Sequence, residues 1–413
     1  MNSKLKTSAF AASHSAAPAR RLQNSKLARL VPALLDWFAK NARDLPWRRT
    51  RDPYAIWVSE IMLQQTQVKT VIPYWERWLR ELPTFAAVAK AGPNKIHKLW
   101  EGLGYYTRAR NLQWAAKQIM EKHGGKFPRN FDDVLALPGV GRYTAGAICS
   151  IAFSQPTPIL DGNVIRVLTR IFGIAGNPKE KETNARLWKL AEALVLNAGG
   201  ARLRRAQTSF TKSPTNHKKR HGPTESRPTE NTNHSFLNQS LMELGALVCT
   251  PRNPQCGVCP VKKLCVALRE NRVNELPDLG KREAATARRF VAFVAEQNGR
   301  FLVRQRPAGV VNAHLWEFPN VEILNGKSDP KLLAKNILGA KPPKLQPLCT
   351  VIHSITRYRI TLEAFRAQLR ETSHTNSSKM GIWKTPAQMQ QLAFTAAHKK
   401  LASAAFDCIL SAR

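Results

Sequence analysis

Four of the seven cysteines of this 413-residue chain lie in one short segment. They are Cys249, Cys256, Cys259 and Cys265, whereas the other three are scattered along the chain. Thiolates at such short spacing are typical metal ligands, and an odd, clustered cysteine count favours a reducing environment over a disulfide framework. The segment therefore predicts one metal centre with four sulfur ligands. Spacing alone leaves structural zinc and an iron–sulfur cluster both open.

Glu60 is a carboxylate in an otherwise apolar stretch, Ile56–Leu63. A carboxylate among such residues loses hydration, which raises its pKa and suits it to donating a proton near neutral pH. The alternative is a structural glutamate that caps a neighbouring helix.

Asp161 directly precedes an apolar helical pattern that begins at Val164. The position suits a helix N-cap, and hydrogen bonds from N–H groups to a capping carboxylate favour its ionised form. A proton donor and an anion in opposite environments are what cleavage of a glycosidic bond requires. Glu60 and Asp161 together predict such chemistry, although a cap without a catalytic role explains Asp161 equally well.

The segment Leu137–Gly146 predicts a helix, a glycine-containing turn and a second helix that starts near Arg142. Gly139 and Gly141 let the backbone approach a ligand closely, and the second helix offers free N–H groups to a phosphate. The pattern indicates a hairpin that grips a DNA backbone without reading its sequence. An ordinary tight turn between packed helices is the alternative.

The composition indicates a polyanionic partner. Lys and Arg number 64 against 28 Asp and Glu, a net charge of +36, which predicts a nucleic acid or an acidic membrane surface as partner. No apolar run reaches the ~20 residues that a membrane-spanning helix needs, so an integral membrane protein is excluded. The basic segment 1–26 predicts a disordered arm, with an organelle transit peptide as the alternative.

Helical patterns position these residues. An apolar stripe follows Lys26, from Leu27 to Phe38, and the cap Asp52-Pro53 opens a helix expected to run through Lys69. We expect an all-helical domain over 27–200, a polar, disordered basic insertion over 201–235, and a metal module over 236–270 that begins as a helix.

The pattern changes after a linker at 271–286. Phe290–Glu296 and Arg300–Arg306 alternate around Asn298-Gly299, which predicts a tight β-hairpin, and Cys349–Phe365 predicts a second strand pair. Residues 287–413 are therefore expected to form a separate α+β domain.

Six motifs together resemble the MutY adenine DNA glycosylases, over about residues 27–270 strongly and over the remainder weakly. They are Leu45-Pro-Trp-Arg48, Trp57–Val68, Gly102-Leu-Gly-Tyr-Tyr106, the glycine hairpin with Tyr143, Leu160-Asp-Gly-Asn-Val164 and the cysteine spacing. The resemblance implies a mainly α N-terminal region with the helix-hairpin-helix glycosylase fold and one [4Fe–4S] cluster per chain. It also implies a C-terminal α+β Nudix-like domain that recognises 8-oxoguanine.

The resemblance also implies roles for single residues. Glu60 would protonate adenine at N7 and Asp161 would stabilise the sugar cation or its adduct, with Tyr143 and Asn163 holding that site. The adenine pocket would be lined by Trp47, Arg48, Leu63 and Gln239. Gln65 and Tyr105 would wedge into the duplex near 8-oxoguanine, although a packed core tyrosine is the alternative for Tyr105.

Two departures affect the C-terminal domain. The His-x-Phe-Ser-His loop of the family reads His353-Ser-Ile-Thr-Arg357 here, which keeps a hydroxyl at Thr356 but replaces the second histidine. Nothing resembles the acidic motif of Nudix hydrolases, so nucleotide hydrolysis is not expected. Thr356 is the residue that we expect to contact the lesion.

The predicted function is a monofunctional glycosylase that removes adenine mispaired with 8-oxoguanine or guanine in duplex DNA. A thymine-mismatch glycosylase or an endonuclease III-like lyase is the nearest rival, and a non-catalytic lesion-binding protein is a rival from another class. The resemblance further implies a monomer that works with the chromosome in a bacterial cytoplasm, or in a mitochondrion or nucleus if the N-terminal segment is a transit peptide.

Overall fold

The structure is a computed structural model that describes residues 16–199, 233–281, 283–324, 329–339, 341–369 and 381–410. Contacts between Cα atoms divide the chain into two compact units. The first comprises Met1–Gln65 and Gln118–Gly280, and the second comprises Thr66–Lys117 and Lys281–Arg413. The sequence predicted one helical domain over 27–200, whereas the structure assigns its middle part to the second unit.

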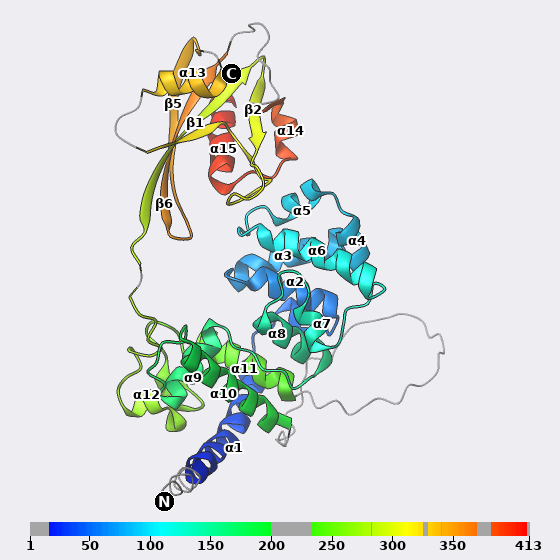
Figure 1. The fold of residues 1–413 in the computed structure, drawn as a ribbon, viewed down its shortest axis with the longest axis vertical. Helices are drawn as coiled ribbons and strands as arrows, with labels where there is room; N and C mark the ends of the chain where they lie inside the picture. Colours follow the sequence, from blue (N-terminus) through cyan, green and yellow to red (C-terminus); the bar gives the residue numbers. More distant parts are fainter. Residues whose placement is uncertain are drawn as a thin grey trace, which may run out of the picture. The chain divides into compact units, whose positions relative to one another are not determined.

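The first unit is helical (Figure 1). Its elements are α1 (Ala16–Asn41), the short 3-10 helix η1 (Pro46–Arg48), α2 (Pro53–Leu63), the end of α6 (Thr107–Lys122), α7 (Phe131–Leu135), α8 (Arg142–Phe153), α9 (Gly162–Phe172), α10 (Lys181–Gly199), α11 (Asn233–Leu247), η3 (Cys256–Val258), η4 (Lys262–Leu264) and α12 (Val266–Arg269). The predicted all-helical character of this part is confirmed.

The core of the first unit is the predicted apolar stripe of α1 packed against α9, α10 and α11. Leu30, Leu34, Leu168, Leu194 and Leu237 are fully buried in it. The helix α1 begins at Ala16, earlier than the helical pattern expected from Lys26. Most of the predicted 201–235 insertion lies outside the described residues, and α11 already begins at Asn233.

The prediction of one continuous helix from Pro53 to Lys69 is wrong. The cap forms as expected, because the side chain of Asp52 accepts a hydrogen bond from the Tyr54 N–H, but α2 ends at Leu63 and α3 starts at Val68. The cause is local: Gln65 has a φ of 56°, a left-handed conformation that a right-handed helix does not accommodate. Gln65, which lies at this break between α2 and α3, is exposed.

The helical part of the second unit comprises α3 (Val68–Glu81), α4 (Phe85–Lys90), α5 (Pro93–Trp100) and the first part of α6. Its interior is built on aromatic residues. Trp78 and Trp100 are fully buried and pack edge to face, with ring centroids 5.6 Å apart. Such pairs add to the stability that burial alone provides.

The rest of the second unit is a mixed sheet with the strand order β3-β2-β1-β6-β5, to which β4 adds through β1 and β7 through β2. The strands are β1 (Thr286–Gln297), β2 (Arg300–Gln305), β3 (Trp316–Glu317), β4 (Asn320–Ile323), β5 (Lys344–Ile355), β6 (Tyr358–Gln368) and β7 (Ile382–Lys384). Both predicted strand pairs are confirmed: β1 pairs with β2 around Asn298-Gly299, and β5 pairs with β6. Both turn residues have positive φ, as a two-residue hairpin requires.

Helices cover both faces of this sheet (Figure 1). Side chains of β1 alternate, so that Val294 packs toward α15 (Ala396–Leu410) and Phe293 toward α13 (Pro330–Leu338). A further short helix, α14 (Pro386–Gln390), begins with a capping box at Thr385. The predicted α+β character is thus confirmed. In the part of the chain that the structure describes, no helix is long and apolar enough to cross a membrane.

Candidate active site

Glu60 lies on the buried face of α2 and faces the start of α8. Only 5% of Glu60 is exposed, and its carboxylate accepts a hydrogen bond of 3.1 Å from the hydroxyl of Tyr143. Burial raises the pKa of Glu60 to about 7, and the nearby charge of Asp161 adds to this rise, while the bond from Tyr143 and the charge of Arg48 oppose it. Burial also raises the pKa of Tyr143, which therefore remains a hydroxyl. Glu60 can consequently hold a proton near neutral pH, as the sequence predicted.

Asp161 caps α9, as its position predicted. Its Oδ1 accepts the N–H of Val164 at 2.8 Å, and its Oδ2 accepts the amide of Asn163 at 3.0 Å. The sequence predicted that capping would favour the ionised form of Asp161, but the structure gives the opposite direction. Burial raises the pKa of Asp161, and this effect exceeds the lowering by the hydrogen bonds and by the charge of Arg166. Burial therefore raises the pKa of both carboxylates, which differ in their hydrogen-bond partners.

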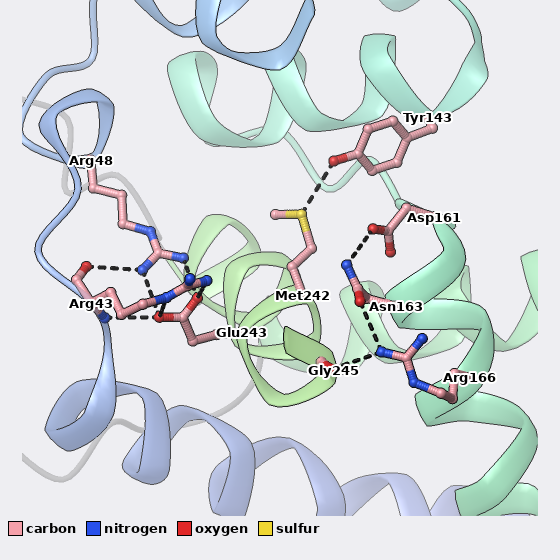
Figure 2. Close-up of polar contacts among 9 residues, drawn as sticks. All are labelled: Arg43, Arg48, Tyr143, Asp161, Asn163, Arg166, Met242, Glu243 and Gly245. Atoms are coloured by element: carbon pink, nitrogen blue, oxygen red, sulfur yellow. Dashed lines mark hydrogen bonds and ion pairs between the residues drawn. The ribbon is translucent and has the colours of Figure 1, made fainter. Parts of the chain in front are cut away.

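Arg48 in η1 is fixed by a buried glutamate that the sequence analysis missed. Both terminal nitrogens of Arg48 lie within 3.1 Å of the carboxylate of Glu243, and Arg43 binds the same carboxylate through its side chain and its backbone N–H (Figure 2). Although burial alone would raise it, the hydrogen bonds from Arg43 and Arg48 lower the pKa of Glu243 to about 2. The guanidinium of Arg48 is thereby held in one orientation.

The other residues predicted for a base pocket belong to the same unit. Trp47 is 6% exposed beside Arg48 in η1, and Leu63 is half-buried one turn after Glu60 on α2. Gln239 is 8% exposed on α11 and donates to the hydroxyl of Ser235 at 3.1 Å. Gln239 precedes Glu243 by one helical turn, so both project from the same side of α11.

Arg166 connects the Asp161 cap to the cysteine segment, a link that the sequence did not suggest. Its guanidinium donates to Oδ1 of Asn163 at 2.9 Å, to the carbonyl of Gly245 at 2.7 Å and to the carbonyl of Cys249 at 2.7 Å (Figure 2 shows the first two). At Gly245 the helices α9 and α11 touch: an added Cβ would lie only 2.6 Å from Cβ of Asn163. Asn163 is therefore held by Arg166 and by close packing.

The four cysteines line one small hollow together with Arg170. Burial, together with the neighbouring thiols, raises the pKa of Cys256, Cys259 and Cys265. In the described residues no three His, Cys, Asp or Glu side chains converge on one ion position. Sulfur donors arranged around a hollow nevertheless fit a multi-iron cluster, in which each iron takes one thiolate. Arg170, 2% exposed, adds a positive charge 3.4 Å from Sγ of Cys249.

The glycine hairpin has the predicted form. Helix α7 is followed by a turn in which Gly139 has a φ of 78°, and α8 begins at Arg142 after the capping residue Gly141. Both glycines and Arg142 are exposed, and the guanidinium of Arg142 stacks 4.0 Å from the ring of Trp188. The N-terminal N–H groups of α8 are thus accessible beside a positioned cation.

Three residues predicted to contact DNA share an unusual backbone. Gln65, Tyr105 and Thr356 have φ values of 56°, 47° and 53°, and all three are exposed. Residues with side chains rarely adopt this left-handed region, and such strain is concentrated at functional sites. The packed-core alternative for Tyr105 is wrong, since 49% of its surface is exposed. Tyr105 and Thr356 belong to the second unit, whereas all the residues around Glu60 belong to the first.

The residues that the sequence analysis missed had a recognisable signal. Glu243 is the only charged residue between Phe236 and Val248, and Arg166 and Arg170 are the only charged residues of the mainly apolar helix α9. A lone charge in an apolar helix is buried only when it is paired. The sequence does not, however, identify the partner.

Known proteins match both units. Residues 58–193 match the HhH-GPD superfamily of base excision DNA repair proteins, residues 249–265 the iron–sulfur binding domain of endonuclease III, and residues 290–404 the NUDIX domain. The adenine DNA glycosylase of Rattus norvegicus is 35% identical over 89% of this chain and 76% of its own length. This chain belongs to the adenine DNA glycosylase family.

Adenine DNA glycosylases from distant organisms show a similar degree of identity to this chain. The Homo sapiens protein is 33% identical, covering 89% of this chain and 72% of its own length. The protein of Buchnera aphidicola subsp. Schizaphis graminum is 32% identical, covering 85% of this chain and 91% of its own. A solved thermostable thymine-DNA glycosylase is 30% identical over 60% of this chain with a TM-score of 0.48, a likeness that carries no argument about substrate.

Membership confirms the predicted family, the helix-hairpin-helix and Nudix-like fold classes, the enzyme class and the iron–sulfur cofactor. The chain is a DNA glycosylase, a hydrolase whose partner is DNA, and it has a [4Fe–4S] module. The iron–sulfur match begins at Cys249 and ends at Cys265, so it spans all four clustered cysteines. When bound, such a cluster supplies metal–thiolate bonds that stabilise the fold of the module.

Proposed function

We propose that this glycosylase removes adenine paired with 8-oxoguanine or guanine from duplex DNA by hydrolysing the N-glycosidic bond. The observation that carries the proposal is Glu60, a buried carboxyl with a pKa of about 7 that is held by Tyr143 next to the second carboxylate. A general acid functions best when its pKa lies near the working pH. Adenine leaves readily once its ring is protonated, so this proton is what the reaction needs.

In the proposed mechanism Glu60 donates its proton to N7 of the flipped adenine, and the glycosidic bond breaks with its electron pair remaining on the base. The sugar becomes cationic, and ionised Asp161 stabilises it. Asn163 and the N–H of Val164 orient this carboxylate. A water molecule then adds to the sugar carbon and releases a proton, which completes hydrolysis.

We assign the adenine pocket to Trp47, Arg48, Leu63 and Gln239. A flipped base needs an apolar or aromatic surface and a few fixed polar groups to read its edge. Trp47 and Leu63 supply the first, and Arg48 and Gln239 supply the second. The two hydrogen bonds from Arg48 to Glu243 support this assignment, because they fix the guanidinium before the base arrives.

The duplex is bound at several exposed points. Gly139, Gly141 and Arg142 would contact a phosphate, so Arg142→Ala should weaken binding to all duplexes alike and reduce its salt dependence. Gln65 and Tyr105 would wedge between bases, and Thr356 would contact the lesion. The strained, exposed backbone of these last three residues supports a role outside the folding core.

The four clustered cysteines would ligate the [4Fe–4S] cluster, one per chain. We further propose that the enzyme acts as a monomer alongside the chromosome, in a bacterial cytoplasm or, if the N-terminal segment is a transit peptide, in an organelle. Sedimentation with and without duplex DNA tests the monomer directly.

Adenine release from defined duplexes tests the substrate. Purified enzyme is incubated with duplexes that place A, G or T opposite 8-oxoguanine and A or T opposite G, and abasic sites are cleaved with alkali. Strand breaks should occur only at adenine, in both mispairs. Release of thymine from a G·T duplex would instead establish the thymine-mismatch rival.

The same assay separates hydrolysis from lyase chemistry. Tyr143 supplies no amine, so borohydride should trap no covalent enzyme–DNA adduct through that position. Strand cleavage without alkali, accompanied by a trapped adduct, would contradict a monofunctional glycosylase.

A further inference from the structure

Glu101 is a buried carboxylate at the start of the turn that presents Tyr105. Only 7% of its side chain is exposed, and its carboxylate accepts three donors of the second unit, two lysine ammonium groups and one backbone N–H. Its Oε2 is 2.9 Å from Nζ of Lys98 and 2.8 Å from Nζ of Lys399, and its Oε1 accepts the N–H of Phe394 at 3.2 Å. Lys98 also donates to the carbonyl of Leu392 at 3.2 Å.

The partners of Glu101 come from both parts of the second unit. Lys98 belongs to α5, which leads into the turn, whereas Phe394 and Lys399 belong to the C-terminal Nudix-like part. Phe394 is 3% exposed in the core between the sheet and α15, so its N–H is fixed. A second hydrogen bond connects the same two parts: Arg110 at the start of α6 donates to the carbonyl of Ala313 at 3.1 Å.

Side chains of the second unit hold the turn between Glu101 and Tyr105, so a displacement of Glu101 is expected to displace Tyr105 as well. The carbonyl of Glu101 accepts the hydroxyl of Tyr74 at 2.8 Å, and a Cβ at Gly102 would lie 2.2 Å from that hydroxyl. Arg108 donates to the carbonyl of Gly104 at 3.1 Å and lies 5.6 Å from the ring centroid of Tyr105. The backbone that leads to Tyr105 is therefore held by side chains of the same unit.

We propose that Glu101 is a positioning residue through which the segment Leu392–Lys399 of the Nudix-like part fixes the turn that presents Tyr105. Of the three residues assigned to the lesion side of the duplex, Tyr105 and Thr356 then belong to the second unit, whereas Gln65 belongs to the first. Loss of the Glu101 contacts is expected to increase the mobility of the turn and to leave Glu60 and Asp161 in the first unit unchanged. The role in lesion binding rests on the proposed function, whereas the coupling itself does not.

Hydrogen–deuterium exchange of the full-length holoenzyme tests the coupling. Lys399→Met should accelerate exchange of the Gly102–Tyr106 amides, nearly 300 residues away in sequence, by roughly tenfold, because a charge-assisted bond to a buried carboxylate is lost. Lys399→Arg should restore slow exchange. The neighbouring Lys400, also exposed on α15, provides the control, and Lys400→Met should change nothing in the turn.

The reciprocal variant guards against a general loss of folding. Glu101→Gln keeps the shape of the side chain and should accelerate exchange both in the turn and in Leu392–Lys399, while the β5–β6 amides remain protected. Unchanged exchange of the turn in Lys399→Met, or equal acceleration in Lys400→Met, would overturn the proposal.

Binding to a lesion duplex then tests whether the coupling of Glu101 to Leu392–Lys399 contributes to lesion binding. With an A·8-oxoguanine duplex, Lys399→Met should bind several-fold more weakly and still release adenine at the wild-type single-turnover rate at saturating enzyme. Faster exchange with unchanged affinity would leave the coupling in place and remove its role in lesion binding. Failure of adenine release by the wild type would count against the proposed function alone.

Discussion

Glu60 and Glu243 are both buried in the first unit, yet their surroundings favour opposite protonation states. The side chain of Glu60 meets a tyrosine hydroxyl, and burial raises its pKa to about 7. Glu243 meets two guanidinium groups, and although burial alone would raise it, their hydrogen bonds lower its pKa to about 2. Burial therefore raises the pKa of a carboxylate at both positions, and only the two charged partners of Glu243 are strong enough to reverse this rise.

The difference separates two kinds of buried carboxylate. Glu60 can give up a proton at neutral pH and take it back, as a general acid must. Glu243 remains charged at any physiological pH and can only orient its arginines. Three variants test this contrast in four measurements, in order of decreasing expected effect.

The largest effect is expected for Glu60→Gln on adenine release. An amide cannot donate the proton, so the single-turnover rate at saturating enzyme should fall by about 10²–10⁴-fold with little loss of duplex affinity. Glu182→Gln, an exposed glutamate of the same unit, is the control and should behave as wild type. Near-wild-type release from Glu60→Gln would remove Glu60 from the chemistry.

The second effect is a loss of stability in Glu243→Gln. Removing the charge of the buried Glu243 leaves Arg43 and Arg48 without their counter-ion, which should lower the free energy of unfolding by about 3–5 kcal/mol. Arg43 is partly exposed, so the lower value is the expected one. Urea unfolding under anaerobic conditions, with Glu192→Gln on α10 as the exposed control, provides the measurement. A loss below that of the control would show that the arginines find other partners.

The third effect is a gain of stability in Glu60→Gln at high pH. The pKa of Glu60 is raised in the folded state, so wild-type stability should fall as pH rises from about 4.5 to about 7 and then level off. Glutamine cannot ionise and should abolish this fall, making the variant more stable by about 1–3 kcal/mol at pH 8 and equal to wild type at pH 4.5. Equal stability at both pH values would place the pKa of Glu60 near its ordinary range.

The smallest effect is a shift of the pH profile in Tyr143→Phe. Wild-type adenine release should decline above about pH 7 as Glu60 loses its proton. The Tyr143 hydrogen bond lowers the pKa of Glu60, so its removal should move this decline upward by about half to one pH unit. Single-turnover rates between pH 6 and 9 measure the shift. A downward shift would mean that the tyrosine stabilises the protonated carboxyl.

Local signals in the sequence predicted most of the fold. Asp52-Pro53 identified the start of α2, Asn298-Gly299 identified the β1–β2 turn, and the stripe after Leu27 identified the core face of α1, because each depends on neighbouring residues alone. The break at Gln65 was missed since the segment Gln64–Gln67 contains neither glycine nor proline. Gln65 is also exposed, so no apolar pattern marks its left-handed backbone.

The chemistry of the site was predictable only in part. Apolar neighbours correctly indicated a raised pKa for Glu60. The capping role of Asp161 was also predicted correctly. The direction of its pKa shift was predicted wrongly, because its burial depends on elements far along the chain. Glu243 contacts Arg43 across 200 positions and Arg166 contacts Cys249 across 83, and no local pattern encodes such pairs.

Gly245 shows that a residue without a functional group can be as restrictive as a carboxylate. Because α9 and α11 touch at this point, even a methyl group would press on Asn163, which holds Asp161. In a genetic screen for lost repair, substitutions at this position would therefore be recovered alongside those of Glu60 and Asp161. A geneticist who reads such alleles as catalytic would be mistaken about the chemistry but correct about the phenotype.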